Sequence, residues 1–276
     1  MNHEGTLYIV PTPIGNLEDI TLRGLRILHS ADLIAAEDTR HTGKLLQHFQ
    51  ITTPQISYHE HNRTARLEAL LAQLQVGKTI ALVTDAGMPG ISDPGYELIQ
   101  ACIKAEISVV PLPGANAAIT ALAAAGLKSD RFVFEGFLPT KQRGEMLNTL
   151  KNETRTLIFY EAPHRLLQTL QDLAAVFGGD RSVVLARELT KLHEDFWRGT
   201  LEDAIQLSEV KHPKGEYTLV VAGASKTPTL ELSPAEIKLQ LDKMLQQGIR
   251  RSEACRELAD LTGLSRRQIY QLSLGL

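Results

Sequence analysis

The sequence predicts an α/β fold with two sheet-containing domains, followed by a small helical region. Over the first 111 residues, short apolar runs alternate with helical patterns, which is typical of a mostly parallel sheet covered by helices on both faces. From residue 132 the strand-like runs lengthen, and the last of them follow one another with little helix between. This change predicts a second α/β domain with a mixed sheet.

The first domain is predicted over residues 1–113. Its strands are the apolar runs Thr6–Val10, Leu33–Ala36, Ile56–Tyr58, Ile80–Val83 and Ser108–Pro111. Helical periodicity falls between them, over residues 22–28, 44–49, 65–74 and 96–102. The segment Pro111-Leu112-Pro113-Gly114 holds two prolines and a glycine, and it predicts the hinge to the next domain.

The second domain is predicted over residues 114–224. It opens with the alanine-rich run Gly114–Gly126, which favours a helix that packs close to a sheet. Trp197 lies in one of its strands and is expected in the core. The predicted strands are 132–135, 156–160, 182–186, 195–199 and 217–222, with helices over 144–150, 166–177 and 201–207.

Residues 225–276 predict a linker and a helical tail. Ser225–Leu232 contains Pro228 and reads as the linker. Ser233-Pro234-Ala235-Glu236 then combines an N-cap serine, a proline at the first helical position and a glutamate at the third. Helical patterns over 252–261 and 265–274 flank Thr262-Gly263-Leu264, which is typical of a helix-turn-helix. Residues 238–276 carry seven basic and four acidic side chains, so the tail is either a nucleic-acid contact module or a solvated helical cap.

Composition excludes several classes of protein. With 43% hydrophobic and 22% charged residues in 276, the chain is neither disordered nor collagen-like. Only two cysteines, Cys102 and Cys255, exclude a disulfide scaffold and fit a reducing cytosol. No secretory signal is evident, and no apolar run reaches the roughly 18 residues of a membrane span. We therefore expect a cytoplasmic protein with no membrane partner. A net charge of −3 leaves room for a local basic patch.

Three loops follow predicted strands at the edge where open α/β sheets bind ligands. Pro11–Leu17 is stiff, and it matches neither a dinucleotide fingerprint nor a P-loop. Thr84–Gly95 holds three glycines, two prolines and two aspartates in twelve residues, which indicates a binding loop that a ligand can approach closely. Pro113–Ala117 opens a helix, whose free N–H groups can hold a polar ligand.

Together these loops resemble the tetrapyrrole-methylase superfamily of S-adenosyl-L-methionine-dependent methyltransferases, and most closely its members that methylate ribosomal RNA. The resemblance covers residues 5–276 and includes several further motifs. With the loop Asp85–Gly95, these are Thr12-Pro13-Ile14-Gly15-Asn16-Leu17, Glu37-Asp38-Thr39-Arg40, Tyr58-His59-Glu60-His61-Asn62, Tyr160-Glu161-Ala162-Pro163-His164-Arg165, Arg187-Glu188-Leu189-Thr190-Lys191 and Lys214-Gly215-Glu216.

The resemblance implies two α/β domains of the tetrapyrrole-methylase type, with the cofactor S-adenosylmethionine in the cleft between them. It implies methyl transfer to the ribose 2′-hydroxyl of a cytidine in the decoding region of 16S rRNA, with small-subunit rRNA or the 30S ribosomal subunit as partner. It also implies a homodimer. The cofactor pattern of the superfamily falls on Ile14, Asp85, Ala86, Gly87, Gly90, Asn116, Ala117, Tyr160 and Leu189.

Two groups of side chains are candidates for the chemistry of methyl transfer. A ribose hydroxyl is a poor nucleophile, so a base or a cation that stabilises the developing alkoxide would help. Glu161, His164 and Arg165 follow one predicted strand, and Glu188 and Lys191 follow another. They are expected to contact the ribose, a phosphate or the cofactor. The alternative is an ion-pair network that joins the two loops.

Two other polar segments leave functional and structural interpretations open. Asp38 or Thr39 could cap the next helix, or Arg40 could contact an RNA phosphate. His59 and His61 would point the same way in an extended segment, but no third ligand of suitable spacing is evident. We therefore predict no metal, and the two histidines are expected either to contact RNA or the active site or to make structural hydrogen bonds. Rival functions are methylation of a tetrapyrrole, methylation in the diphthamide pathway, and a non-catalytic RNA-binding or ribosome-assembly factor.

Overall fold

The computed structural model describes residues 5–225, 232–262 and 264–274. The chain divides into two compact units, Met1–Gly223 and Ala224–Leu276. The first unit holds two five-stranded sheets and the second is helical. The α/β fold class predicted from the sequence is confirmed.

The first sheet, predicted to be mostly parallel, is parallel throughout, with strand order β3-β2-β4-β1-β5. Because β4, β1 and β5 are neighbours, the three loops that follow them open side by side at the carboxyl edge of the sheet. The strands are β1 (Thr6–Ile9), β2 (Leu33–Ala36), β3 (Gln55–Ser57), β4 (Thr79–Val83) and β5 (Ser108–Pro111). The helices are α1 (Leu22–Ser30), α2 (Thr39–His48), α3 (Arg63–Gln75) and α4 (Tyr96–Lys104), with a 3-10 turn η1 (Leu17–Asp19).

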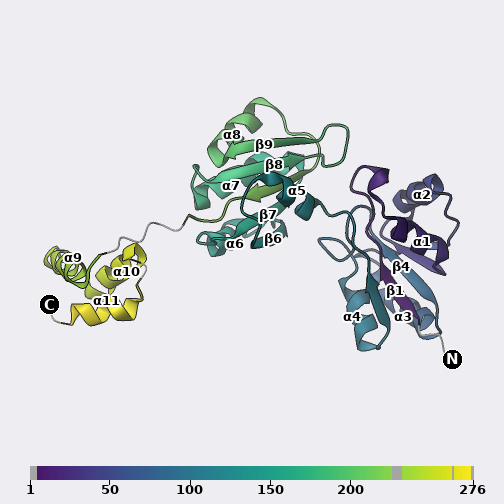
Figure 1. Cartoon of the computed structure of the whole chain (residues 1–276), viewed down its shortest axis with the longest axis horizontal. Helices are drawn as coiled ribbons and strands as arrows, with labels where there is room; N and C mark the ends of the chain where they lie inside the picture. Colours follow the sequence, from purple (N-terminus) through teal and green to yellow (C-terminus); the bar gives the residue numbers. More distant parts are fainter. Residues whose placement is uncertain (1–4, 226–231, 263, 275–276) are drawn as a thin grey trace. The chain divides into compact units, whose positions relative to one another are not determined.

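Helices cover both faces of the first sheet (Figure 1). Side chains alternate along each strand, so β4 sends Ile80 and Leu82 to one face and Ala81 and Val83 to the other. The face of Ile80 packs on α3 and α4, and the opposite face packs on α1 and α2. Burial on both faces fixes the sheet, and it leaves the strand ends as the place for ligand loops.

The second sheet is mixed, also as predicted, with order β6-β7-β10-β8-β9. Only β6 and β7 pair in parallel, and the last strand to be made, β10, lies in the middle between β7 and β8. The strands are β6 (Phe132–Phe137), β7 (Thr156–Glu161), β8 (Ser182–Arg187), β9 (Asp195–Thr200) and β10 (Tyr217–Val221). Helix α5 (Ala117–Ala125) packs on one face. The other face holds Trp197 and is covered by α6 (Arg143–Leu150), α7 (Leu166–Phe177) and α8 (Leu201–Val210).

Two helices begin three or more residues away from their predicted starts, because side chains cap them. Helix α2 starts at Thr39, five residues before the predicted start, since Asp38 Oδ1 accepts a hydrogen bond from Arg40 N at 2.8 Å. Helix α5 starts at Ala117 instead of Gly114. Its N-cap, Asn116, is extended and accepts from Ile119 N at 3.1 Å. Asp38 therefore caps α2, which is the structural interpretation of the segment Glu37–Arg40.

The second unit is a bundle of α9 (Pro234–Gln246), α10 (Arg251–Thr262) and α11 (Arg266–Ser273). Ser233 and Ser265 each form a capping box, which confirms the predicted start at Ser233. A core that includes Ile237, Leu241 and Ile269 joins the helices. The predicted linker over 225–232 falls mostly on residues 226–231, and these lie outside the described residues, as does Gly263 of the predicted turn.

Candidate active site

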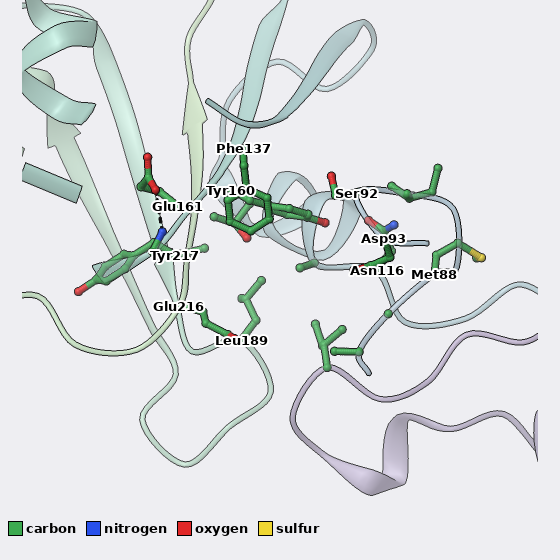
Figure 2. A pocket seen from close by; sticks show the side chains of 18 of the residues that line it. Met88, Ser92, Asp93, Asn116, Phe137, Tyr160, Glu161, Leu189, Glu216 and Tyr217 are labelled. Atoms are coloured by element: carbon green, nitrogen blue, oxygen red, sulfur yellow. Dashed lines mark hydrogen bonds between the residues drawn. The ribbon is translucent and has the colours of Figure 1, made fainter. Parts of the chain in front are cut away.

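A cavity of about 420 Å³ lies at the ends of strands from both sheets (Figure 2). The loops of the first sheet and the start of α5 supply Ile14, Ala86, Gly87, Met88, Ile91, Ser92, Asp93, Asn116 and Ala117. The second sheet and its loops supply Phe137, Tyr160, Glu161, Ala162, Pro163, Ala186, Leu189, Glu216, Tyr217 and Thr218. The cavity therefore brings together segments that are about 200 residues apart in sequence.

Two loops of the first sheet are fastened to each other beside this cavity. Thr12 and Gly87 exchange two backbone hydrogen bonds of 2.9 Å, in an isolated antiparallel bridge. The Thr12 hydroxyl also donates to Thr84 O at 2.9 Å, and both residues are buried. Gly87 has φ +80°, and a Cβ there would lie 3.4 Å from Ile14 Cγ2. A glycine at this bridge therefore leaves room between the two loops.

The start of α5 is held by the second sheet. Asn116 uses its side-chain oxygen to cap the helix. The backbone N–H of Ala118, in the first turn of α5, donates to Tyr160 Oη at 3.1 Å. Burial raises the pKa of Tyr160, although the bond from Ala118 acts in the opposite direction. The phenol therefore stays protonated and fixes the helix N-terminus against β7.

The first loop also touches the second sheet directly. Asn16 N donates to Thr190 Oγ1 at 3.1 Å, across 174 residues of sequence. Ile14 packs against the apolar cluster of α5, β7, β8 and β10. These contacts tie the first loop to the loop after β8 and to the apolar cluster under α5.

The nine predicted cofactor residues separate into two groups. Ile14, Ala86, Gly87, Asn116, Ala117, Tyr160 and Leu189 line the large cavity. Asp85 lines two smaller neighbouring cavities instead. Its carboxylate accepts from Asp38 N at 3.2 Å, and its own N–H donates to Glu37 Oε2 at 3.2 Å. Gly90 N donates to Pro94 O and so closes the loop on itself.

The structure brings Glu161 and Arg165 together but leaves His164 apart from the cavity wall. Glu161 lines the cavity, yet its side chain is buried. One of its oxygens accepts from Thr169 Oγ1 at 2.6 Å, and the other accepts from Ala162 N at 2.8 Å and lies 3.4 Å from Arg165 Nε. His164 lies in the 3-10 turn η2 (Pro163–Arg165).

Glu188 and Lys191 meet each other on the loop after β8, and Glu216 joins them. Lys191 Nζ lies 3.0 Å from Glu188 Oε1 and 2.8 Å from Glu216 Oε2. Burial alone would lower the pKa of Lys191, but the bonds to Glu216 and Glu188 raise it. The Glu216 backbone N–H, followed by Lys191, lowers the pKa of Glu188. Lys191 and Glu188 are therefore charged near neutral pH, and with Glu216 they form a network within the second sheet.

Sequence reasoning missed several residues of the wall, of which Asp93 is the most distinctive. Burial raises its pKa to about 7, and the charges of Glu37 and Asp85 add to the effect. Ser92 and Asp93 lie in the loop Thr84–Gly95, which the sequence predicts as a binding loop. Its sequence pattern does not indicate whether Asp85 or Asp93 faces the cavity. Phe137, Tyr217 and Thr218 come from strands that carried no ligand signal.

The described residues hold neither a metal-binding cluster nor a membrane-spanning helix. No group of three or more His, Cys, Asp or Glu there is arranged to hold a metal ion. His59 and His61 follow β3 outside any strand, with ring centroids 6.0 Å apart. No helix in the described chain combines the length and apolar character needed to cross a membrane.

Comparisons with known proteins agree with this architecture. The family model for tetrapyrrole (corrin/porphyrin) methylases matches residues 6–205. A Synechocystis protein named ribosomal RNA small subunit methyltransferase I is 59% identical over 99% of this chain and 98% of its own. A protein of the same name from Halalkalibacterium halodurans is 50% identical over 98% and 94%.

A solved structure supports the fold independently. It is the uroporphyrin-III C-methyltransferase of Thermus thermophilus complexed with S-adenosylhomocysteine, with a TM-score of 0.56 at 15% identity, and it covers 78% of this chain and 97% of its own. The chain thus belongs to the tetrapyrrole methylase family, among the relatives named ribosomal RNA small subunit methyltransferase I.

Proposed function

We propose that this chain is an S-adenosylmethionine-dependent methyltransferase that modifies the ribose 2′-hydroxyl of a cytidine in the decoding region of 16S rRNA. One observation carries the proposal. A cavity of about 420 Å³ lies at the strand ends of a chain whose relatives, at 50–59% identity over nearly its full length, are named for methylation of small-subunit rRNA. The names of the relatives support methyl transfer to rRNA as the reaction. The cavity supports the place in the chain where we propose that this reaction occurs.

The lining of the cavity fits the proposed cofactor. The volume is within the usual range for small-molecule sites, and the wall combines apolar side chains with a few polar groups. Ile14, Met88 and Leu189 offer apolar surface to an adenine ring or a methionine chain. The backbone at Gly87, which has no Cβ, lets a ligand approach closely. When bound, S-adenosylmethionine supplies a methyl group that is already activated on a sulfonium.

The protein then has to position an oxygen behind that methyl group. Orientation of two reactants in one site contributes about 7–11 kcal/mol in well-organised systems. We propose that the cofactor contacts are those of the nine predicted residues, with Asp85 acting through its loop. His164, Arg165 and Lys191 are our proposed contacts to ribose or phosphate. For the buried Glu161 and the network-bound Glu188, the hydrogen bonds favour a role in fixing the strand ends.

The helical tail is proposed as a contact for RNA phosphates. Six of its seven basic side chains are exposed: Lys238, Lys243, Arg250, Arg256, Arg266 and Arg267. Arg251, the seventh, donates to Ser273 O at 2.9 Å and helps to join two helices. Exposed cations on a folded bundle suit a polyanion.

We also propose the domain limits 1–113, 114–224 and 225–276, with the chain acting in the cytoplasm as a homodimer. Sedimentation equilibrium at micromolar concentration would test the dimer. A single species at the mass of one 30.4 kDa chain would contradict it.

The function itself is tested by radiolabelled methyl transfer to 30S subunits that lack the modification. A 2′-O-methyl group protects the adjacent bond from alkaline cleavage, so we expect label at one protected ribose. Labelling of a uroporphyrin-type macrocycle and not of subunits would favour the rival tetrapyrrole activity. A protein that binds subunits but not S-adenosylmethionine would favour a non-catalytic assembly factor.

A further inference from the structure

The titratable side chains on the cavity wall differ sharply in whether they already have partners. Tyr160 accepts from Ala118 N, and burial raises its pKa and that of Tyr217. Glu161 is bonded to Thr169 and Ala162 N inside the second sheet. Glu216 is paired with Lys191 at 2.8 Å. None of these four is both ionised and unengaged at neutral pH.

Asp93 is the exception among the described lining residues. Its carboxylate makes no hydrogen bond or ion pair with any described residue, although the residue is only partly exposed. Figure 2 shows it beside Ser92 and Asn116, on the side of the cavity opposite Glu161 and Tyr217. An unpartnered carboxylate in a ligand cavity is a group available to the substrate.

The surroundings of Asp93 tune its basicity. The charged or titratable groups that face it are Glu37 at the end of β2, Asp85 after β4, and Tyr160 on β7 across the cavity. No cation contributes to its electrostatic environment within the described chain. Burial, followed by the charges of Glu37 and Asp85, raises the pKa of Asp93 to about 7. A base with such a pKa is half-ionised at the working pH of a cytoplasmic enzyme, which is the condition for efficient proton transfer.

We propose that Asp93 accepts the proton of the target ribose 2′-hydroxyl, an assignment that rests on the proposed function. The hydroxyl proton passes to a carboxylate oxygen of Asp93 as the 2′-oxygen forms its bond to the methyl carbon. The carbon–sulfur bond of the donor breaks, and its electron pair stays on sulfur. Asp93 then releases the proton to water, so atoms and charges balance without a further reactant.

The test compares Asp93→Asn with the wild-type protein in single-turnover methylation of unmodified 30S subunits, between about pH 5 and pH 9. General-base catalysis contributes about 10²- to 10⁴-fold, so the variant should lose at least about 100-fold in rate at pH 8. The wild-type rate should rise with pH to a plateau through pH values near the Asp93 pKa of about 7. The variant should lose that rise, while its Kd for S-adenosylmethionine, measured by calorimetry, stays within about threefold.

A second readout does not depend on activity. In protein labelled with ¹³C at aspartate carboxyls, one resonance should titrate near pH 7, and Asp93→Asn should remove it. Glu37→Gln is the matched control, because it removes a neighbouring negative charge but keeps an oxygen that can accept from Asp85 N. It should move both the resonance and the pH–rate midpoint to lower pH, and it should lower the plateau rate far less than Asp93→Asn does.

Five results would overturn the assignment. Wild-type rates in Asp93→Asn would show that the proton goes elsewhere, and a Kd for S-adenosylmethionine raised more than about tenfold would make Asp93 a cofactor ligand. A midpoint unmoved by Glu37→Gln would mean that another group titrates. If Asp93→Asn does not fold, Asp93→Glu keeps a carboxylate, and a loss of the pH dependence in that variant would also refute the idea. Absence of transfer by the wild-type protein itself would refute the proposed function, and this assignment with it.

Discussion

Gly87→Ala should have two separable effects. It should lower stability, because alanine is strained at this backbone conformation, and it should weaken cofactor binding, because Gly87 lines the cavity. At φ +80° an alanine costs about 1–2 kcal/mol, because its Cβ crowds the following carbonyl. For a folded unit of about 220 residues, this lowers the unfolding temperature by about 2–8 °C. The added Cβ would lie 3.4 Å from Ile14 Cγ2, so the structure itself accommodates the methyl group with little clash.

Binding should suffer more than stability, because Gly87 lines the cavity. An added methyl group in a well-fitted site costs about 1–3 kcal/mol, or about 5- to 150-fold in Kd for S-adenosylmethionine. Gly126→Ala is the matched control. Its φ is +76°, and no described atom lies within 4 Å of the new Cβ, so it carries the same backbone cost away from the cavity.

The assays are differential scanning calorimetry for stability and titration calorimetry for cofactor affinity. We expect similar losses of unfolding temperature in the two variants, and a weaker Kd only in Gly87→Ala. Equal Kd values for S-adenosylmethionine in the two variants would refute the proposal that the cofactor binds in the cavity beside Gly87. An unfolding temperature of Gly126→Ala equal to that of the wild type would refute the claim that alanine is strained at this positive φ.

Three further predictions concern other parts of the molecule. Thr169→Val removes the hydroxyl that donates to the buried Glu161 and should cost about 1–3 kcal/mol in urea unfolding; a loss below about 0.5 kcal/mol would contradict that bond's importance. The folded-state pKa of Asp93, about 7, lies above the usual carboxyl range, so its ionisation opposes folding as pH rises from about 4 to 7. The unfolding temperature of Asp93→Asn should therefore rise relative to wild type between pH 5 and pH 8, and a constant difference in calorimetry would argue against the raised pKa. Replacing Arg266 and Arg267 by Gln should lower the slope of log Kd for rRNA against log salt by about 2, whereas an unchanged slope would argue against phosphate contacts there.

Local patterns predicted the elements because burial and capping act over short distances. The continuous apolar run of β4 meets helices on both faces, and a sequence in which such runs alternate with helical segments has few other folds. The start at Ser233 was predicted for the same reason, since its capping box lies within four residues. At Asp38 and Asn116 periodicity is given more weight than capping, and the predicted starts of α2 and α5 therefore differ from the observed ones.

The cavity wall was harder to predict because it depends on pairings far apart in sequence. Tyr217 and Thr218 belong to β10, and no local signal inserts that strand between β7 and β8. Asp85 and Asp93 lie in one loop, but only the folded loop directs the carboxylate of Asp85 toward Asp38 N and that of Asp93 into the cavity. The bond from Thr169 to Glu161, made from a neighbouring helix, likewise depends on tertiary packing.

The central position of β10 also bears on how the protein is made. The first sheet is complete once Pro111 has emerged from the ribosome, and it can form while synthesis continues. The second sheet has a gap between β7 and β8 until Tyr217–Val221 arrive, roughly a hundred residues later. At about 5–20 residues per second, that interval lasts about 5–20 s. Once β7 and β8 have emerged, the edges that β10 will join stay unpaired until it arrives, and the ligand cavity does not exist before then. A nascent-chain protease pulse should therefore find residues 1–111 protected well before the second sheet.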